Sequence, residues 1–241
     1  MLDIRRKSVK GETFTEEHMA TRRSPTSEPR VHLTRERVLR AAIDLADEAG
    51  IESLSMRKLG QALGVEAMSL YNHVANKDDI LNSIIDIVES DIELPTPGAE
   101  WKSALRRTAM SAHDAFERHP WAASLTLSTT GDRPARWRYM NAILGCLREA
   151  GFSAETTDLA YHALESHISG FTLWAAQLQV DEAELPDLAT AFLADLPADD
   201  LPYLVEHVHQ HLKERDPEAE GAFAFGLDLI LDGLERIQRT A

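Results

Sequence analysis

Residues 55–77, SMRKLGQALGVEAMSLYNHVANK, decide the fold of the amino-terminal part of this chain. The first half carries an apolar helical face made of Leu59, Ala62 and Leu63. Gly64 follows, and glycine adopts the positive φ of a helix end without the steric cost of a Cβ atom. A second helix is expected from about Glu66, with Leu70 and Val74 on its inner side. The stretch therefore predicts two helices joined by a tight turn, as in a helix-turn-helix.

Capping residues predict the helices around this stretch. Thr34 and Ser55 can cap the first and second helices, because a side-chain hydroxyl accepts a hydrogen bond from a free amide of the first turn. Gly50 is expected to end the first helix. Asn76 is expected to cap a longer helix that continues to about Ile92.

The remainder of the chain is predicted to be helical as well. Apolar residues recur at helical spacing, and no alternating strand pattern is present. The stripes are Trp101, Leu105, Thr108, Ala112 and Phe116; Trp137, Met140, Leu144 and Leu147; Ala160, Leu164, His167, Phe171, Trp174 and Leu178; and Phe223, Leu227, Ile230, Leu234 and Ile237. An acidic, proline-containing stretch at 181–202 should precede a helix near 203–213. The fold class is therefore all-α.

Several segments resemble the tetracycline-repressor (TetR) family of transcriptional regulators. In the first part of the chain they are LSMRKL at 54–59, LGVE at 63–66, SLYNHV at 69–74, and Asn76 with Lys77. Further similarity lies at 101–105, 151–153 and 222–235. The resemblance implies an N-terminal three-helix DNA-binding domain and a C-terminal helical domain for ligand binding and dimerisation. We expect a flexible basic arm at 1–33, the helix-turn-helix domain at 34–80, and the effector-binding and dimerisation domain at 81–241.

The same resemblance implies a repressor that binds a palindromic, double-stranded DNA operator as a homodimer and is released by a small-molecule effector. Arg57 matches a family position that reaches the major groove, where arginine commonly binds guanine. The candidates for phosphate contacts are Ser55, Tyr71, His73 and Lys77, and those for base edges or thymine methyl groups are Ala67, Met68, Ser69 and Asn72. Tyr71 could equally pack in part against the core.

Two further residue sets follow from the predicted C-terminal helices. Small and apolar residues that favour close approach of a second copy are Ala163, Gly170, Leu173, Ala222, Gly226, Leu229 and Gly233. Candidates for a ligand pocket are Trp101, Thr108, Ala112, Trp137, Met140, His167, Phe171 and Trp174, although aromatic stripes are also typical of plain core. In the family member that binds the drug, four positions contact the drug and magnesium. In this sequence those positions are occupied by Ser90, Thr108, Ala112 and Thr126. The expected effector is therefore not tetracycline.

The charges of the chain are unevenly distributed. Residues 1–77 carry 13 basic and 11 acidic side chains, whereas residues 78–241 carry 12 and 29. Because the DNA backbone is negative, this distribution favours an orientation in which the N-terminal part faces the duplex.

Other functional classes lack a matching sequence pattern. An enzyme is not expected, since no nucleophile elbow, phosphate-binding glycine loop, cysteine pair or HExxH motif occurs. No cofactor or metal is expected, and His207, His209 and His211 are interpreted as solvated. No membrane partner is expected without a long apolar run or an apolar leader, and the single Cys146 fits a cytoplasmic location. The alternative is a DNA-independent helical ligand-binding or interaction protein with a degenerate recognition segment.

Overall fold

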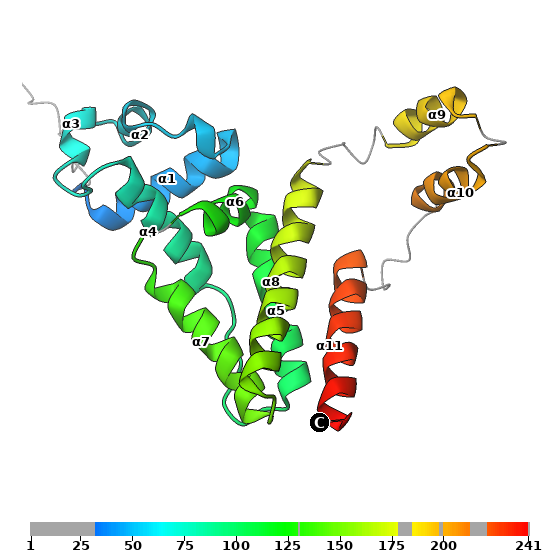
Figure 1. The fold of residues 1–241 in the computed structure, drawn as a ribbon. Helices are drawn as coiled ribbons and strands as arrows, with labels where there is room; N and C mark the ends of the chain where they lie inside the picture. Colours follow the sequence, from blue (N-terminus) through cyan, green and yellow to red (C-terminus); the bar gives the residue numbers. More distant parts are fainter. Residues whose placement is uncertain (1–31, 130, 178–184, 198–199, 213–220, 241) are drawn as a thin grey trace, which may run out of the picture. The chain divides into compact units, whose positions relative to one another are not determined.

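The computed structural model describes residues 32–129, 131–177, 185–197, 200–212 and 221–240, and these contain helices and no strand (Figure 1). The all-α prediction is therefore confirmed. Residues 1–31 of the predicted arm, and Leu178 of the third stripe, lie outside the described residues.

Three of the first helices begin directly after the predicted caps Thr34, Ser55 and Asn76, whereas the helix expected to carry both Leu70 and Val74 ends at Leu70. The first helices are α1 (Arg35–Ala49), the short 3₁₀ helix η1 (Ile51–Ser53), α2 (Met56–Leu63), α3 (Ala67–Leu70) and α4 (Lys77–Ser90). The side chains of Thr34, Ser55 and Asn76 each accept a hydrogen bond from an amide three residues later, at 3.2, 3.3 and 2.8 Å. Gly50 and Gly64 have φ angles of 75° and 67°, so glycine is favoured at both helix ends.

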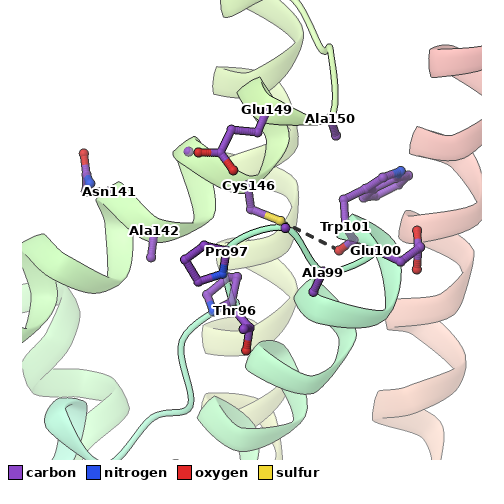
Figure 2. A pocket seen from close by; sticks show the side chains of 13 residues that line it. Thr96, Pro97, Ala99, Glu100, Trp101, Asn141, Ala142, Cys146, Glu149 and Ala150 are labelled. Carbon is purple, nitrogen blue, oxygen red and sulfur yellow. Dashed lines mark hydrogen bonds between the residues drawn. The ribbon is translucent and has the colours of Figure 1, made fainter.

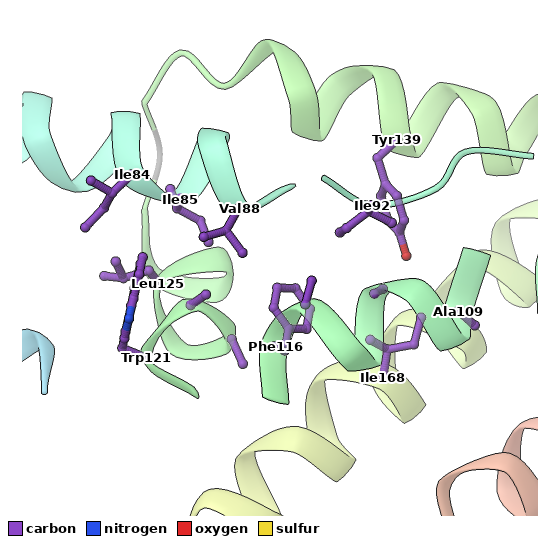
Figure 3. Close-up of a cluster of buried hydrophobic side chains, with 14 of the residues drawn as sticks. Ile84, Ile85, Val88, Ile92, Ala109, Phe116, Trp121, Leu125, Tyr139 and Ile168 are labelled. Carbon is purple, nitrogen blue, oxygen red and sulfur yellow. The ribbon is translucent and has the colours of Figure 1, made fainter. Parts of the chain in front are cut away.

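The C-terminal part consists of α5 (Trp101–Arg118), α6 (Pro120–Ser128), α7 (Pro134–Glu149), α8 (Ala154–Gln177) and α11 (Ala222–Thr240). Helices α5, α8 and α11 lie side by side (Figure 1). Helices α9 (Leu185–Asp195) and α10 (Pro202–His211) pack on each other. The main core joins α4 to α5, α6, α7 and α8, and its labelled side chains in Figure 3 include Val88, Ile92, Phe116, Tyr139 and Ile168.

The structure corrects four expectations about these helices. Helix α6 was not predicted, nor was α9, which lies inside the acidic stretch at 181–202; both have a proline in their first turn, where its missing amide hydrogen is tolerated. In the α7 stripe Leu147 is buried and Met140 and Leu144 pack against the core as predicted, but Trp137 is 58% exposed, and Tyr139 and Ile143 are buried instead. On α11 the predicted Phe223, Leu227 and Leu234 are buried, but Leu231 is buried as well and Ile237 is exposed.

Hydrogen bonds explain the orientation of α7. The Tyr139 hydroxyl donates to Glu165 Oε1 on α8 at 2.7 Å, and the Arg136 guanidinium donates to Glu165 Oε2. Both α7 side chains must therefore face α8. This turns Trp137, which lies between them in sequence, toward the outside.

Candidate DNA interface and effector domain

Helices α2 and α3 approach so closely that only glycine fits at residue 60. A Cβ atom on Gly60 would lie 2.9 Å from the carbonyl oxygen of Val65 and 3.2 Å from the amide nitrogen of Ala67. The Val65 amide in turn donates to the Gly60 carbonyl at 2.9 Å. These are backbone atoms, which cannot move aside as a flexible side chain could. Ala62, predicted on the inner face, is exposed.

The predicted DNA-contacting side chains all lie at or near the surface of the segment from α2 to the start of α4. The exposed ones are Arg57, Met68, Tyr71, Asn72 and Lys77, and the partly exposed ones are Ser55, Ala67, Ser69 and His73. Beneath them Leu59, Leu70 and Val74 are buried. The Ser55 hydroxyl accepts the capping bond through its oxygen, so its hydrogen can still be donated to a phosphate.

An ion pair between α1 and α4 holds the end of residues 67–73, the predicted recognition segment. The Arg35 guanidinium donates to both carboxylate oxygens of Asp79, at 2.6 and 2.9 Å, and to the carbonyl oxygen of His73 at 3.0 Å. The Ala75 amide donates to Asp79 Oδ2 at 2.8 Å. These bonds, above all the one from Arg35, lower the pKa of Asp79 to about 2. The backbone that follows α3 is thus fixed from two sides.

A second polar contact joins α1 to α6. Asp47 Oδ1 accepts a hydrogen bond from Trp121 Nε1 at 2.6 Å and lies 2.9 Å from His119 Nδ1. Asp86 on α4 accepts from the Ala135 amide at the start of α7, at 2.7 Å. The helix-turn-helix unit is therefore attached to the C-terminal helices through α6 as well as through α4.

A cluster of charged and polar side chains is buried between α4, the end of α6 and the start of α7. Glu89 on α4 accepts a hydrogen bond from the Thr126 hydroxyl at 3.1 Å. Arg133, the residue before α7, donates through Nη2 to the Thr126 carbonyl at 3.2 Å, and its Nη1 lies 3.5 Å from Glu89 Oε1. Burial raises the pKa of Glu89, because a carboxylate loses hydration in the interior.

A second ion pair, partly buried, adjoins this cluster. Arg136 donates to Glu165 and to the Tyr161 hydroxyl, the latter at 3.0 Å, and Tyr139 donates to the other Glu165 oxygen. Burial, followed by the charge of Glu165, raises the pKa of Tyr161 to about 12. Sequence analysis missed both groups. The available signal was a charged residue at an inward helical position, since Glu89 follows the buried Ile85 by four residues.

The predicted pocket residues do not lie in one place. Thr108 and Ala112 are buried on α5, whereas Trp137 lies on the outer side of α7 and Met140 is partly buried. His167, Phe171 and Trp174 belong to an aromatic group on α8 that continues to Phe223 of α11. Trp101 contacts Phe152 and donates to Gln238 on α11 at 3.1 Å.

Trp101 also borders a cavity of about 470 Å³ between the segment before α5 and one side of α7 (Figure 2). Its lining residues come from 95–101 and from Asn141, Ala142, Gly145, Cys146, Glu149 and Ala150. Burial raises the pKa of the Cys146 thiol, so the thiolate is disfavoured there. Apart from Trp101, none of the predicted pocket residues lines this cavity.

Exposed apolar and small residues lie along α8 and α11. On α8 they include Leu159, Ala163, Gly170 and Trp174, and on α11 they include Ala222, Phe225, Leu229 and Ile237. Gly233 is partly exposed and Leu173 is partly buried against the core. A Cβ atom on Gly226 would lie 2.5 Å from the His167 ring, so the small size of Gly226 is already required within the subunit.

Known proteins match the chain over nearly all of this fold. A profile described as "Bacterial regulatory proteins, tetR family" matches residues 38–84, and one described as "Tetracyclin repressor-like, C-terminal domain" matches residues 94–237. The chain belongs to the tetracycline-repressor family. As a member it is a DNA-binding transcriptional regulator that acts as a dimer and responds to a ligand through its C-terminal helices.

Individual relatives agree with this assignment. The tetracycline repressor protein class D of Escherichia coli is 36% identical over 215 residues, covering 87% of this chain and 92% of the relative. The transcriptional repressor DrrR1 of Streptomyces coeruleorubidus is 31% identical, covering 89% and 82%. The structure of ActR from Streptomyces coelicolor in complex with actinorhodin has a TM-score of 0.66 at 26% identity, covering 86% and 99%. None of the described helices is long and apolar enough to cross a membrane.

Proposed function

We propose that this chain represses transcription by binding a palindromic operator as a homodimer, with residues 34–80 as the DNA-binding domain and residues 81–241 as the effector-binding and dimerisation domain. The observation that carries the proposal is the outward presentation of Met68, Tyr71 and Asn72, with Ala67, Ser69 and His73 partly exposed, over the buried Leu59, Leu70 and Val74. A degenerate recognition segment would not need a glycine-dependent contact that fixes α3 on α2.

Each exposed side chain has a proposed role at the DNA. Arg57 donates to guanine in the major groove, while Met68 and Asn72 meet base edges or thymine methyl groups together with Ala67 and Ser69. Ser55, Tyr71, His73 and Lys77 contact phosphates and set the register. A dimer engages two half-sites about 34–36 Å apart, one duplex turn.

Selection from random duplexes with the purified full-length chain tests DNA recognition. Enrichment of one palindrome is expected, and Arg57→Ala should weaken binding to it by about 10- to 100-fold, the worth of a guanine contact. Tyr71→Phe should weaken binding less and leave the salt dependence unchanged, because it removes a neutral hydrogen bond to a phosphate and no charge. The control is Arg118→Ala, an exposed arginine at the end of α5. No enrichment, or unchanged binding in both variants, contradicts the proposal and favours a DNA-independent interaction protein.

The dimer interface is proposed to use the exposed faces of α8 and α11. Leu229 is 56% exposed on α11, so Leu229→Glu should bury a charge at the interface and convert the dimer to monomers. Leu188→Glu on α9 is the matched control, because Leu188 is 50% exposed on a helix outside this face. Sedimentation velocity separates the two results. A Leu229→Glu variant that remains dimeric contradicts this interface.

The effector is proposed to be a small molecule other than tetracycline, bound among α4 to α8. The tetracycline repressor of Acinetobacter baumannii, a fold neighbour, has been solved with minocycline. In this chain Ser90 is exposed, and its hydroxyl donates to the Ile87 carbonyl. Thr126 is hydrogen-bonded to Glu89. We also propose a cytoplasmic location and no catalytic activity, since its relatives are regulators that act on DNA.

A further inference from the structure

The cavity between α7 and the linker that joins α4 to α5 is large enough for a small molecule. Its volume of about 470 Å³ lies within the range of about 300–1,000 Å³ that is typical of ligand sites. Figure 2 shows Ala142, Cys146 and Glu149 of α7 around Thr96 and Pro97 of the linker. The four positions that match the drug and magnesium contacts of the family do not line this cavity, so it is separate from that ligand position.

Local structure shapes both walls of the cavity. In the linker, Pro97 has a restricted φ, Gly98 has a φ of 75°, and a turn is closed by the Ala99 amide, which donates to the Thr96 carbonyl at 3.1 Å. On α7, a Cβ atom at Gly145 would meet no heavy atom within 4 Å, so the missing side chain leaves space open there. Walls that are ordered before binding lose little conformational entropy when a ligand arrives.

The lining carries negative charge and no positive charge. Its acidic side chains are Glu100 and Glu149, and no lysine, arginine or histidine is among the lining residues. Hydrogen bonds from the hydroxyl and the amide of Ser103 lower the pKa of Glu100, which keeps this carboxylate charged. Within the described part of the chain, the Glu149 carboxylate has no hydrogen bond or ion pair, so it can accept a new partner.

Both carboxylates act on the space inside the cavity. The thiol of Cys146 lies in its wall, and the pKa of that thiol is raised by burial first and then by the negative charges of Glu149 and Glu100. The basic residues nearest in sequence are engaged elsewhere, because Lys102 pairs with two acidic residues of α11 and Arg148 donates to a backbone carbonyl. A cation in the cavity is therefore attracted by two carboxylates and repelled by no lining side chain.

We propose that this cavity is a second ligand site, which binds a small organic cation: a protonated amine or a quaternary ammonium group on an apolar body. The cationic group lies beside Glu149, and the charge of Glu100 adds to the attraction. The apolar body packs against Pro97, Ala142 and Cys146, which an inorganic cation would leave uncovered. This inference goes beyond the proposed function, since it assigns a ligand other than the effector that releases the DNA.

Three compounds of one shape test the ligand class. They are 1-naphthylmethylamine, which is protonated at neutral pH, 1-naphthylmethanol, which is neutral, and 1-naphthoate, which is an anion. Broadening of the naphthyl proton NMR signals by the full-length protein measures the three affinities. We expect the amine to bind about fivefold more tightly than the alcohol, the upper end for a partly exposed ion pair, and the anion to bind least. Equal affinities, or binding of none, would overturn the inference.

Salt provides an independent check that charge causes the preference. Raising the salt concentration from about 0.01 M to about 1 M shortens the Debye length from about 30 to about 3 Å. The preference for the amine over the alcohol should therefore shrink toward equal affinity, while the affinity of the alcohol should not fall. A preference that does not change with salt contradicts recognition by carboxylates.

A change of one charge locates the preference in this cavity. Glu149→Gln removes the charge and keeps the size of the side chain, so it should reduce the preference for the amine to within about twofold. The matched control is Glu155→Gln, which changes the net charge equally at an exposed residue of α8 that does not line the cavity. It should keep the preference. An undiminished preference in Glu149→Gln refutes the site.

A cavity-filling variant tests the location without changing a charge. Gly145→Phe places a ring in the space beside α7 and should abolish binding of the amine and of the alcohol, whereas Gly145→Ala should keep both. Thermal unfolding shows whether the phenylalanine variant folds. If it does not, Glu149→Gln decides, because that side chain is exposed and its change leaves the core intact. Binding that survives in folded Gly145→Phe places the probes elsewhere and refutes the site.

DNA binding separates this inference from the proposed function. A wild-type protein that enriches a palindrome but does not prefer the amine refutes the cation site alone. One that prefers the amine but enriches no duplex refutes the repressor function alone.

Discussion

The recognition segment and the interior of the effector domain differ in how completely their polar side chains are hydrogen-bonded. Between residues 34 and 80, the capping side chains and Asp79 are all hydrogen-bonded, and Ser53 Oγ is the one buried side-chain atom without a partner in that range. The described part of the C-terminal helices leaves several such atoms without partners. With Asn82 Oδ1 on α4, they are Glu89 Oε2, Thr108 Oγ1, His113 Nδ1, Arg133 Nη1 and Thr157 Oγ1.

This difference follows from what each region has to do. A DNA-binding surface gains affinity when its backbone is fixed before the duplex arrives, because less conformational entropy is lost on binding. A ligand-responsive interior must change its arrangement when a partner arrives, and unsatisfied buried groups make the unliganded arrangement less favourable. The contact of Asp47 with Trp121 and the continuous helix α4 join the two regions.

The largest effect on stability should come from replacing only one member of the buried pair formed by Glu89 and Arg133. Arg133→Met leaves Glu89 unpaired in the interior, and loss of one partner of a buried pair costs about 3–5 kcal/mol. Chemical unfolding at pH 7 measures this loss. In the double variant with Glu89→Leu most of it should be recovered. If Arg133→Met is as stable as wild type, water must reach the Glu89 carboxylate in the folded protein.

The same variant has a predicted pH dependence. Burial already raises the pKa of Glu89, and Arg133 is the first of the charges that oppose this rise. Without Arg133, folded Glu89 should bind a proton more tightly than unfolded Glu89. The free energy of unfolding must therefore fall as the pH rises above about 4.3, the ordinary glutamate value, and more steeply than in wild type. Parallel curves for the two proteins contradict this.

The next largest effect should be in the DNA-binding domain at Gly60. Gly60→Ala places a Cβ atom 2.9 Å from a backbone carbonyl, and overpacking of this kind costs about 1–3 kcal/mol. Because α3 must shift, affinity for the selected duplex should fall further than stability does. Gly145→Ala on α7 is the matched control, since no heavy atom lies within 4 Å of its Cβ position. It should be neutral or stabilising by up to about 1 kcal/mol.

The ion pair at the end of the recognition segment should have a smaller effect. Arg35→Met removes the donor to the His73 carbonyl and to Asp79, and should weaken DNA binding by about tenfold, the worth of about 1.4 kcal/mol. Arg40→Met on the same helix breaks an exposed pair with Glu36 and should leave binding unchanged. Equal losses in the two variants would mean that general charge, rather than positioning, is responsible.

At low pH, the pair of Asp79 with Arg35 should no longer stabilise the folded state. Its folded pKa of about 2 lies below the unfolded value of about 3.9, so the pair stabilises the folded state above pH 4. That contribution is lost as the pH falls through 2. The stability difference between wild type and Asp79→Asn should therefore narrow from pH 4 to pH 2. A constant difference over this range contradicts the pairing.

The smallest effect should come from the cap of α2. Ser55→Ala removes the acceptor of the Lys58 amide, and such losses cost about 1 kcal/mol. Thermal unfolding checks this, with Ser55→Gly as the control, since glycine at a cap costs a few tenths of a kcal/mol. DNA binding sharpens the comparison. If Ser55 also contacts a phosphate, both variants should lose affinity equally, because both lack the hydroxyl.

Most of the DNA-binding domain could be predicted from local sequence. Thr34, Ser55 and Asn76 accept hydrogen bonds from amides three residues later, and Gly64 adopts a positive φ. These features are local, so they can be predicted without knowing which distant residues pack nearby. The need for glycine at residue 60 could not be predicted, because it depends on how closely α3 passes. The environments of the C-terminal side chains were harder to predict, because the apolar Trp137 is exposed and the charged Glu89 is buried.

The sequence by itself determined where the first helices start and stop, which family the chain belongs to, and which side chains surround Leu70 and Val74. Local hydrogen bonds and apolar spacing carry that information along the chain. The tertiary structure decided which charges are buried together. Glu89, Thr126 and Arg133 come from separate parts of the sequence, and only packing of α4, α6 and α7 removes them from water, while Arg136 and Glu165 between α7 and α8 are partly buried. Desolvation depends on all neighbours in space, so no local pattern could have predicted it.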